Sequence, residues 1–171
     1  MDTETLKKIF IHAPNVGLFA LPITLTMDKY LIDTPLRQCH FLAQIGHESG
    51  ELRYREEIAS GKAYEGRKDL GNDRPGDGPL FKGRGLIQLT GRANYESYGE
   101  YLGRDLLDNP SLVSEDENLC VDVAGWYWQK RNLNKYADRD DIITITKRIN
   151  GGLRGLEDRK RLLELAKDVL I

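Results

Sequence analysis

The sequence has few cysteines and no excess of charge of either sign. Cys39 and Cys120 are its only cysteines, and neither belongs to a C-x-x-C pair. This excludes a disulfide scaffold and a zinc site built from cysteines, and predicts two buried free thiols. The 25 Lys and Arg residues against 27 Asp and Glu residues leave a net charge of -2. Without a broad basic surface, we expect no nucleic-acid partner.

The sequence also lacks a long apolar run. Its most apolar stretch, from Val16 to Leu25, is short and contains Pro22, whereas a helix that spans a bilayer needs about 20 apolar residues. The first eleven residues begin with acidic side chains and show no Sec signal pattern. We therefore expect neither membrane insertion nor a signal peptide, and a substrate outside the membrane would require release by another protein.

The 171 residues predict one domain, 1–171, that is mainly α with at most a small β-hairpin. Seven glycines and two prolines between Gly61 and Gly85 predict a long loop, and loops of this length are usually functional. Leu86–Thr90 is compatible with a short strand. The pattern of apolar residues, caps and breakers predicts helices near 1–11, 23–31, 35–48, 93–102, 117–127, 142–149 and 156–170, the fifth with a capping box that begins at Ser114.

Two glutamates on either side of a glycine are candidates for glycoside hydrolysis, which needs one carboxyl group as acid and one as base or nucleophile. Glu48 and Glu57 lie nine positions apart. On one continuous helix they would face opposite ways, about 13.5 Å apart along the axis. A catalytic pair therefore requires the helix to end between them, and Ser49-Gly50 is a suitable place. Composition alone favours the interpretation of both as solvated surface acids, because Glu is nearly always exposed.

Other chemistries find less support in the sequence. The zinc-protease pattern H-E-x-x-H fails because Glu51 occupies its fifth place. His40 and His47, seven positions apart, leave open a two-histidine zinc site with a third ligand, although packed and hydrogen-bonded histidines are more common. No G-x-S-x-G elbow, P-loop or dinucleotide fingerprint is present. We expect no cofactor and no metal.

Three motifs carry a resemblance to a known family. These are His47-Glu48-Ser49 and Phe81-Lys82-Gly83-Arg84-Gly85-Leu86-Ile87-Gln88-Leu89-Thr90-Gly91-Arg92-Ala93-Asn94-Tyr95, with Ile149-Asn150-Gly151-Gly152-Leu153 near the end. They resemble glycoside hydrolase family 19, which includes plant-type chitinases and lysozyme-like phage endolysins. The resemblance spans roughly residues 15–170, is closest to the endolysin branch, and implies a lysozyme-like fold.

The resemblance implies inverting hydrolysis of a β-1,4 bond, with carboxyl groups about 6.5 to 9.5 Å apart to leave room for a water molecule. Glu48 matches the general acid and Glu57 the base, with Glu56 as the alternative base. Thr90 matches a hydroxyl residue that helps to hold the water. Arg159 matches an arginine that pairs with the base. The substrate-binding residues implied are His47, Gln88, Asn94, Tyr95, Asn150 and Arg159.

The sequence departs from the chitinases in lacking their cysteine framework and in shortening the stretch between the two acids. We therefore expect the glycan strand of bacterial peptidoglycan as partner, and a monomeric phage or prophage endolysin. Such an endolysin would collect in the host cytoplasm and reach the cell wall after a separate holin opens the inner membrane. A chitinase, a non-catalytic peptidoglycan-binding module and a zinc amidase remain as alternatives.

Overall fold

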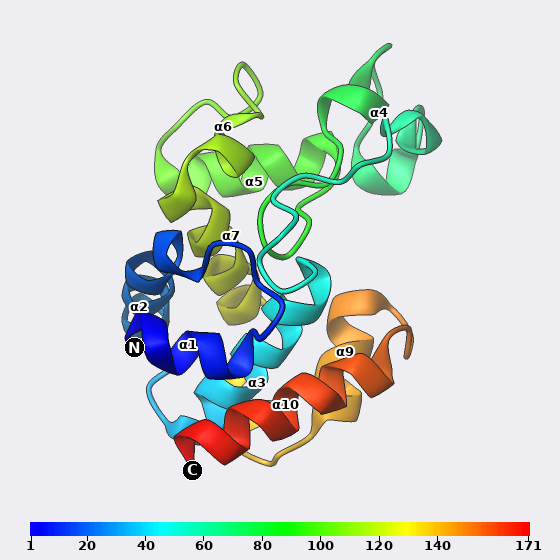
Figure 1. Cartoon of the computed structure of the whole chain (residues 1–171). Coiled ribbons are helices and arrows are strands. Elements are labelled where there is room, and N and C mark those ends of the chain that lie inside the picture. Colours follow the sequence, from blue (N-terminus) through cyan, green and yellow to red (C-terminus); the bar gives the residue numbers. More distant parts are fainter.

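The computed structural model describes residues 1–171 and consists almost entirely of helices (Figure 1). No strand is formed, and the only bridges are the isolated pairs Glu56–Arg84 and Arg84–Leu89. The predicted mainly helical fold is confirmed. The helices are α1 (Thr3–Ile9), α2 (Ala20–Lys29), α3 (Pro35–Glu48), α4 (Asp77–Leu80), α5 (Arg92–Leu102), α6 (Leu112–Glu115), α7 (Glu117–Lys130), α8 (Asn134–Ala137), α9 (Ile142–Asn150) and α10 (Leu156–Leu170).

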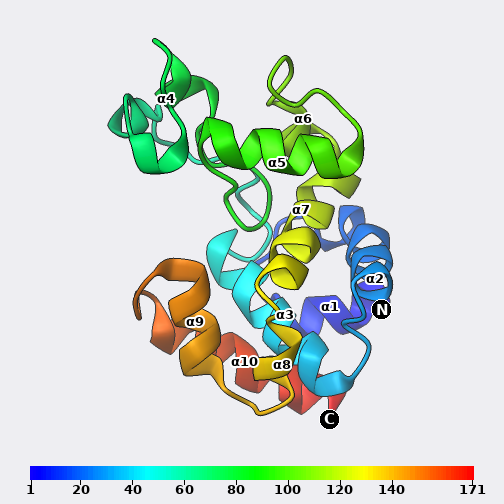
Figure 2. The same ribbon diagram turned by 180° about the vertical axis from the view of Figure 1, so that it is seen from behind.

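Helix α3 occupies the centre of the helical body. It begins where predicted, because Thr34 accepts a hydrogen bond from the backbone N–H of Arg37 and Pro35 fills the first helical position. Eight consecutive residues of this helix, Cys39–Gly46, are buried. In both views α10 runs along one side of α3, and α7 approaches from the other (Figures 1 and 2). Cys39 and Cys120 are free buried thiols, as predicted.

The start of α7 corrects one prediction from the sequence. Asp116, not Ser114, caps this helix, and its side chain accepts a hydrogen bond from Leu119 N. Ser114 lies inside the short helix α6, which ends at Glu115, and its hydroxyl donates to the carbonyl of Ser111. The capping-box spacing failed because the chain becomes extended at Asp116, two residues later than the pattern indicates.

Residues 61–91 form an irregular lobe at one end of the molecule, far from α10 (Figures 1 and 2). Its regular structure is limited to α4 and two single 3₁₀ turns, η2 (Lys62–Tyr64) and η3 (Lys68–Leu70). The strand allowed for Leu86–Thr90 is absent, because Gln88 has a left-handed backbone with φ of 59°. The chain turns back there, so that Leu89 N donates to the carbonyl of Arg84. None of the helices combines the length and apolar character that a bilayer crossing demands.

Candidate active site

Helix α3 ends at Glu48, as the sequence predicted. Beyond Ser49, the residues Gly50, Glu51 and Leu52 all have left-handed backbones, with φ between 56° and 66°. Such a run cannot continue a right-handed helix. The chain therefore leaves the axis of α3, and Glu57 belongs to a different segment from Glu48.

Glu48 is held by an arginine from α10. Arg159 is buried, and its Nη2 lies 2.6 Å from Glu48 Oε1 while its Nη1 donates to Gln44 Oε1 at 2.5 Å. The Glu48 side chain is 19% exposed, and its Oε2 has no hydrogen-bond partner in the chain. Arg159 therefore orients one carboxylate oxygen and leaves the other free for chemistry.

The position of Arg159 corrects the expectation that it pairs with the base. It pairs with the proposed acid, because α10 packs against α3 and brings the guanidinium to the end of that helix. The arginine of this site therefore lies beside Glu48 and not beside Glu57.

Glu57 is held by neutral donors from the glycine-rich lobe. Gly83 N donates to Glu57 Oε1 at 2.6 Å, and the Tyr64 hydroxyl donates to Glu57 Oε2 at 3.0 Å. Burial raises the pKa of Tyr64, and its hydrogen bond to Glu57 acts in the same direction. Sequence reasoning missed Tyr64, because an aromatic residue among glycines carries no periodic signal.

Glu56, the alternative base, has a different environment. Its Oε1 accepts from Arg84 Nε at 2.9 Å and lies 3.6 Å from Lys82 Nζ. Arg84 is nearly buried and also donates to the carbonyl of Leu80 and to the hydroxyl of Tyr95. Glu56 therefore neutralises a structural arginine, which favours Glu57 as the base.

The glycines of the Gly83-Arg84-Gly85 motif allow two close approaches. A Cβ atom at Gly83 would lie 2.7 Å from Gln88 Oε1 and 3.4 Å from Glu57 Oε1. At Gly85, where φ is 81°, a Cβ atom would lie 2.5 Å from a methyl carbon of Val123. The motif thus packs the lobe against α7 and brings Gln88 and Glu57 to the same backbone position.

Three of the predicted site residues line one pocket of about 190 Å³, which is walled on its other side by α7 and Ile149. These three are Gln88, Thr90 and Asn94. The Thr90 hydroxyl donates to the carbonyl of Gln88 at 2.9 Å, and Asn94 Nδ2 donates to the carbonyl of Thr90 at 2.8 Å. These two hydrogen bonds fix the backbone from Gln88 to Asn94, which forms one wall of the pocket.

Neither Glu48 nor Glu57 lines this pocket, but each acts on a residue that does. Tyr127 lines it from α7, and its pKa is raised by burial, against the opposing charge of Arg131, with the charge of Glu48 adding to the rise. Gln88 lines the pocket from the lobe, and the Oε1 atoms of Gln88 and Glu57 both lie close to Gly83. Glu57 is therefore linked to the pocket by packing at Gly83, and Glu48 by the effect of its charge on Tyr127.

Tyr95 does not take the substrate-binding position expected of it. Its side chain is completely buried, and its hydroxyl donates to the carbonyl of Lys82 at 2.6 Å. Burial raises the pKa of Tyr95, in spite of the adjacent charge of Arg84. Its helical position, three residues before another buried tyrosine, Tyr98, places it in the core, where it braces the motif instead of contacting sugar.

Like Arg159, the expected binding residues His47 and Asn150 lie outside the pocket lining. His47 Nδ1 is 2.7 Å from Asp158 Oδ2, and its ring packs so closely on Gly155 that any Cβ there would clash at 2.2 Å. Asn150 Oδ1 accepts a hydrogen bond from Arg154 N at 3.3 Å. In this structure both residues shape the turn between α9 and α10.

The histidines do not come together as a metal site. His40 Nε2 contacts Asp140 Oδ1 at 2.7 Å, whereas His47 contacts Asp158. No group of three His, Cys, Asp or Glu side chains has an arrangement that could hold a metal ion. The two histidines are therefore hydrogen-bonded separately.

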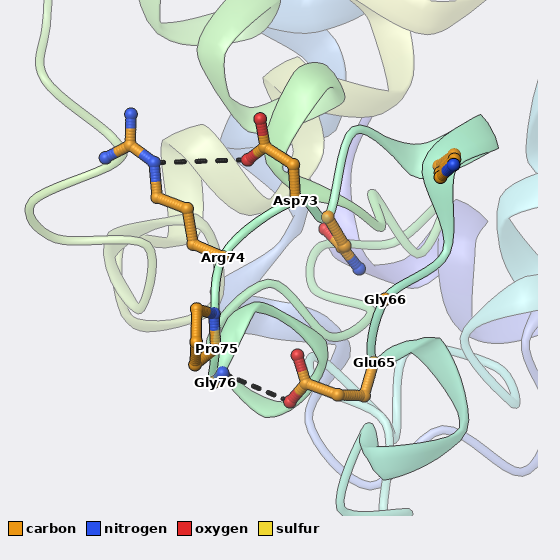
Figure 3. A pocket seen from close by; sticks show the side chains of 8 residues that line it. Glu65, Gly66, Asp73, Arg74, Pro75 and Gly76 are labelled. Carbon is orange, nitrogen blue, oxygen red and sulfur yellow. Dashed lines mark hydrogen bonds and ion pairs between the residues drawn. The ribbon is translucent and has the colours of Figure 1, made fainter.

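A larger cavity, of about 620 Å³, lies within the lobe (Figure 3). It contains none of the predicted site residues. In Figure 3 the Glu65 carboxylate accepts from Gly76 N at 3.2 Å, and Arg74 lies 3.9 Å from Asp73 across the rim. Its lining residues are Glu65, Gly66, Lys68, Asn72, Asp73, Arg74, Pro75 and Gly76. Because Gln88, Thr90 and Asn94 line the smaller pocket, we place the candidate active site there.

Comparison with protein families gives a match over residues 39–153 to the glycoside hydrolase 19 profile, described as chitinase class I. The chain is 33% identical over 189 aligned positions to a glycosyl hydrolase family 19 domain-containing protein of Haemophilus influenzae, covering 92% of this chain and 91% of that protein. It is also similar to an endochitinase of Arabidopsis thaliana, at 39% identity over 111 positions. That match covers 65% of this chain but only 38% of the plant protein.

Solved structures share the fold at lower identity. Chitinase C from Streptomyces griseus superposes with a TM-score of 0.81 at 22% identity, over 99% of this chain and 76% of that one. A bacterial family 19 chitinase superposes with a TM-score of 0.77 at 22% identity, over 96% and 94% of the two chains. The lysozyme-like fold expected from the sequence motifs is thus the fold of this chain.

Proposed function

This chain belongs to glycoside hydrolase family 19, and we propose that it hydrolyses the β-1,4 bond between N-acetylmuramic acid and N-acetylglucosamine in bacterial peptidoglycan. One observation supports the proposal: Gln88, Thr90 and Asn94 line one pocket, and Gln88 packs on Gly83, whose backbone N–H holds Glu57. Family membership makes a glycosidase the coarse assignment. The muramidase activity, the endolysin role and the residue roles are the proposal.

In the proposed mechanism Glu48 is the general acid. Arg159 holds Oε1, so that the free Oε2 is the atom that gives its proton to the leaving glycosidic oxygen. Glu57 is the base that takes a proton from water, since its carboxylate is fixed by Gly83 N and Tyr64. The Thr90 hydroxyl donates to the carbonyl of Gln88 and therefore offers its lone pairs to that water. Inversion follows when water attacks from the face opposite the leaving group.

Peptidoglycan is the preferred substrate for two reasons. The relative matched over nine-tenths of its length is bacterial, while the matched stretch covers only 38% of the plant endochitinase. The chain also has no disulfide, so it lacks the cysteine framework of the chitinases it resembles. As an endolysin, a monomer would act on the wall from the host cytoplasm after a separate holin opens the inner membrane.

The second candidate is a chitinase that acts on polymers of N-acetylglucosamine. It is favoured by the names of the plant relatives and of the solved structures, which are chitinases. Both candidates use the same pair of carboxylates. They differ in the sugar that ends up with the new reducing end, so product analysis separates them.

The test is mass spectrometry of borohydride-reduced products from purified peptidoglycan, and from chitohexaose, after digestion by wild type and by Glu48→Gln. We expect reduced muramic acid ends with wild type only, since loss of a general acid slows hydrolysis by about 10²- to 10⁴-fold. Equal thermal unfolding of the two proteins is the control. Reduced glucosamine ends from peptidoglycan, or products from chitohexaose alone, would favour the chitinase. Appreciable turnover by folded Glu48→Gln would remove Glu48 from the mechanism.

A further inference from the structure

The pocket that Gln88, Thr90 and Asn94 line has a cationic wall that the catalytic mechanism does not use. Lys130 and Arg131, at the end of α7, line the same pocket as Gln88, Thr90 and Asn94. The Lys130 ammonium lies 4.8 Å from the ring centre of Trp126, and the Arg131 guanidinium carbon lies 3.5 Å from that of Tyr127. Aromatic faces thus hold both cations at the pocket wall.

These two cations differ from the arginines elsewhere around the site. Arg84, Arg92 and Arg159 each lie within 3.0 Å of a carboxylate oxygen of the chain. Lys130 and Arg131 form no ion pair, and the only polar side-chain partner of Lys130 is the hydroxyl of Ser97, at 3.3 Å. Their charge is therefore available to a ligand in the pocket.

The charge selects among possible glycans. Chitin is a chain of N-acetylglucosamine units and carries no charge, so it gains nothing from two cations. Each muramic acid in peptidoglycan bears a lactyl group that ends in a carboxylate or continues into a peptide with carboxylates of its own. A carboxylate beside a guanidinium and an ammonium forms charge-assisted hydrogen bonds, which are stronger than neutral ones.

We propose that Lys130 and Arg131 bind a carboxylate carried by the lactyl group or stem peptide of muramic acid, and so select peptidoglycan over neutral glycans. This specificity site rests on the proposed function.

The experiment uses soluble peptidoglycan fragments in three forms: native, with all carboxylates converted to amides, and with the peptide removed to leave the lactyl carboxylate. Wild type is compared with the double variant Lys130→Gln/Arg131→Gln. A matched control, Lys8→Gln/Arg139→Gln, removes the same charge from exposed positions that line no pocket and form no ion pair. Thermal unfolding of all three proteins checks the fold.

We expect wild type to have a kcat/KM roughly 10- to 100-fold higher on native than on amidated fragments, mainly through KM. The double variant should lose that preference and cleave amidated fragments as wild type does, while the control keeps wild-type values. A preference retained on peptide-free strands assigns the lactyl carboxylate, and one lost on them assigns the stem peptide.

Two results would overturn the proposal. Equal kcat/KM of wild type on native and amidated fragments would show that no carboxylate is recognised, while leaving the peptidoglycan activity in place. If the double variant lost kcat/KM equally on native and amidated fragments, the cations would act on the fold or on the sugar itself. Failure of wild type to cleave any of the fragments would instead reject the peptidoglycan substrate, and with it the specificity site.

Discussion

The two candidate catalytic carboxylates are fixed by two regions with different construction. Glu48 ends a helix of the packed body, and its partner is a buried charged side chain, Arg159 from α10. Glu57 lies in an irregular segment, and its partners are a backbone N–H and a phenol from the glycine-rich lobe. The body therefore positions its carboxylate by side-chain packing, whereas the lobe does so by close backbone approach at Gly83.

This difference has consequences for how each region tolerates change. A buried ion pair couples the acid to the stability of the whole body, because a partner left alone in the core is costly. A backbone donor cannot be removed by ordinary substitution and costs the fold little to provide. We therefore expect changes around Glu48 to affect stability and changes around Glu57 to affect rate.

The largest expected effect tests whether Glu57 or Glu56 is the base. Glu57→Gln should slow hydrolysis by about 10²- to 10⁴-fold with little change in unfolding, because Gly83 and Tyr64 can still bond the amide. Glu56→Gln should retain most activity but lower the free energy of unfolding by about 1–3 kcal/mol, since Arg84 loses its carboxylate.

Both variants are measured by release of reducing ends from peptidoglycan and by urea unfolding. If Glu56→Gln is inactive and Glu57→Gln is active, the assignment of the two acids is reversed. If both are inactive and stable, the lobe holds its base by a contact other than those described.

The next effect concerns stability of the body. Arg159→Met keeps side-chain volume but leaves Gln44 and Glu48 without their donor, and should lower the free energy of unfolding by about 2–4 kcal/mol. For a chain of this length that is roughly a 5–15 °C fall in Tm. The corresponding change in the lobe, Tyr64→Phe, removes one partly exposed hydroxyl and should cost about 1 kcal/mol or less. Both variants are measured by calorimetry. Equal falls in Tm for Arg159→Met and Tyr64→Phe would contradict the expected difference between the body and the lobe.

The same contrast explains what the sequence could predict. Helix α3 and its end at Glu48 were predictable, because Thr34-Pro35 and the Ser49-Gly50 break are local signals. The pairing of Arg159 with Glu48 was not, since it joins residues 111 positions apart and depends on how α10 packs on α3. The sequence motifs located Gln88, Thr90 and Asn94, but periodicity could not show that Tyr95 is buried.

Within the lobe the prediction failed for a related reason. A loop rich in glycine has no period from which contacts can be inferred, so neither the Tyr64 hydrogen bond nor the left-handed Gln88 had a signal.

The cationic wall formed by Lys130 and Arg131 at the end of α7 was also missed, because charged residues at a helix end are usually exposed to solvent and have no further role. Only the structure shows that Lys130 and Arg131 line the same pocket as Gln88, Thr90 and Asn94.

A smaller effect is expected at Thr90. Thr90→Val removes the hydroxyl that bonds the Gln88 carbonyl and offers its lone pairs to water, and should slow hydrolysis by roughly 10- to 100-fold. Thr90→Ser keeps the hydroxyl and should retain most of the rate. Initial rates on peptidoglycan, with circular dichroism as the control for folding, check both variants. An unchanged rate in Thr90→Val would remove this residue from the site.

The smallest effect is a pH dependence confined to the body. His40 is completely buried on α3, and burial lowers its pKa although the hydrogen bond to Asp140 opposes the shift. Lys167, which pairs with Asp140, and the carboxylate of Asp141 are the other charges that act on the ring. Its Nδ1 has no hydrogen-bond partner, so a proton added there would lack an acceptor.

Because the folded pKa of His40 lies below the unfolded value of about 6.5, the unfolded state binds the proton more readily. The stability is therefore fully present above pH 6.5 and falls as the pH drops from there through the folded pKa. Urea unfolding between pH 7.5 and 5 should show this fall, and the range stays above the region where the lowered pKa of Asp140 contributes. His40→Gln keeps a donor for Asp140 without titrating, and should give a flatter profile. Parallel profiles for wild type and His40→Gln would assign the acid sensitivity to groups other than His40, and the comparison between the body and the lobe would lose its electrostatic part.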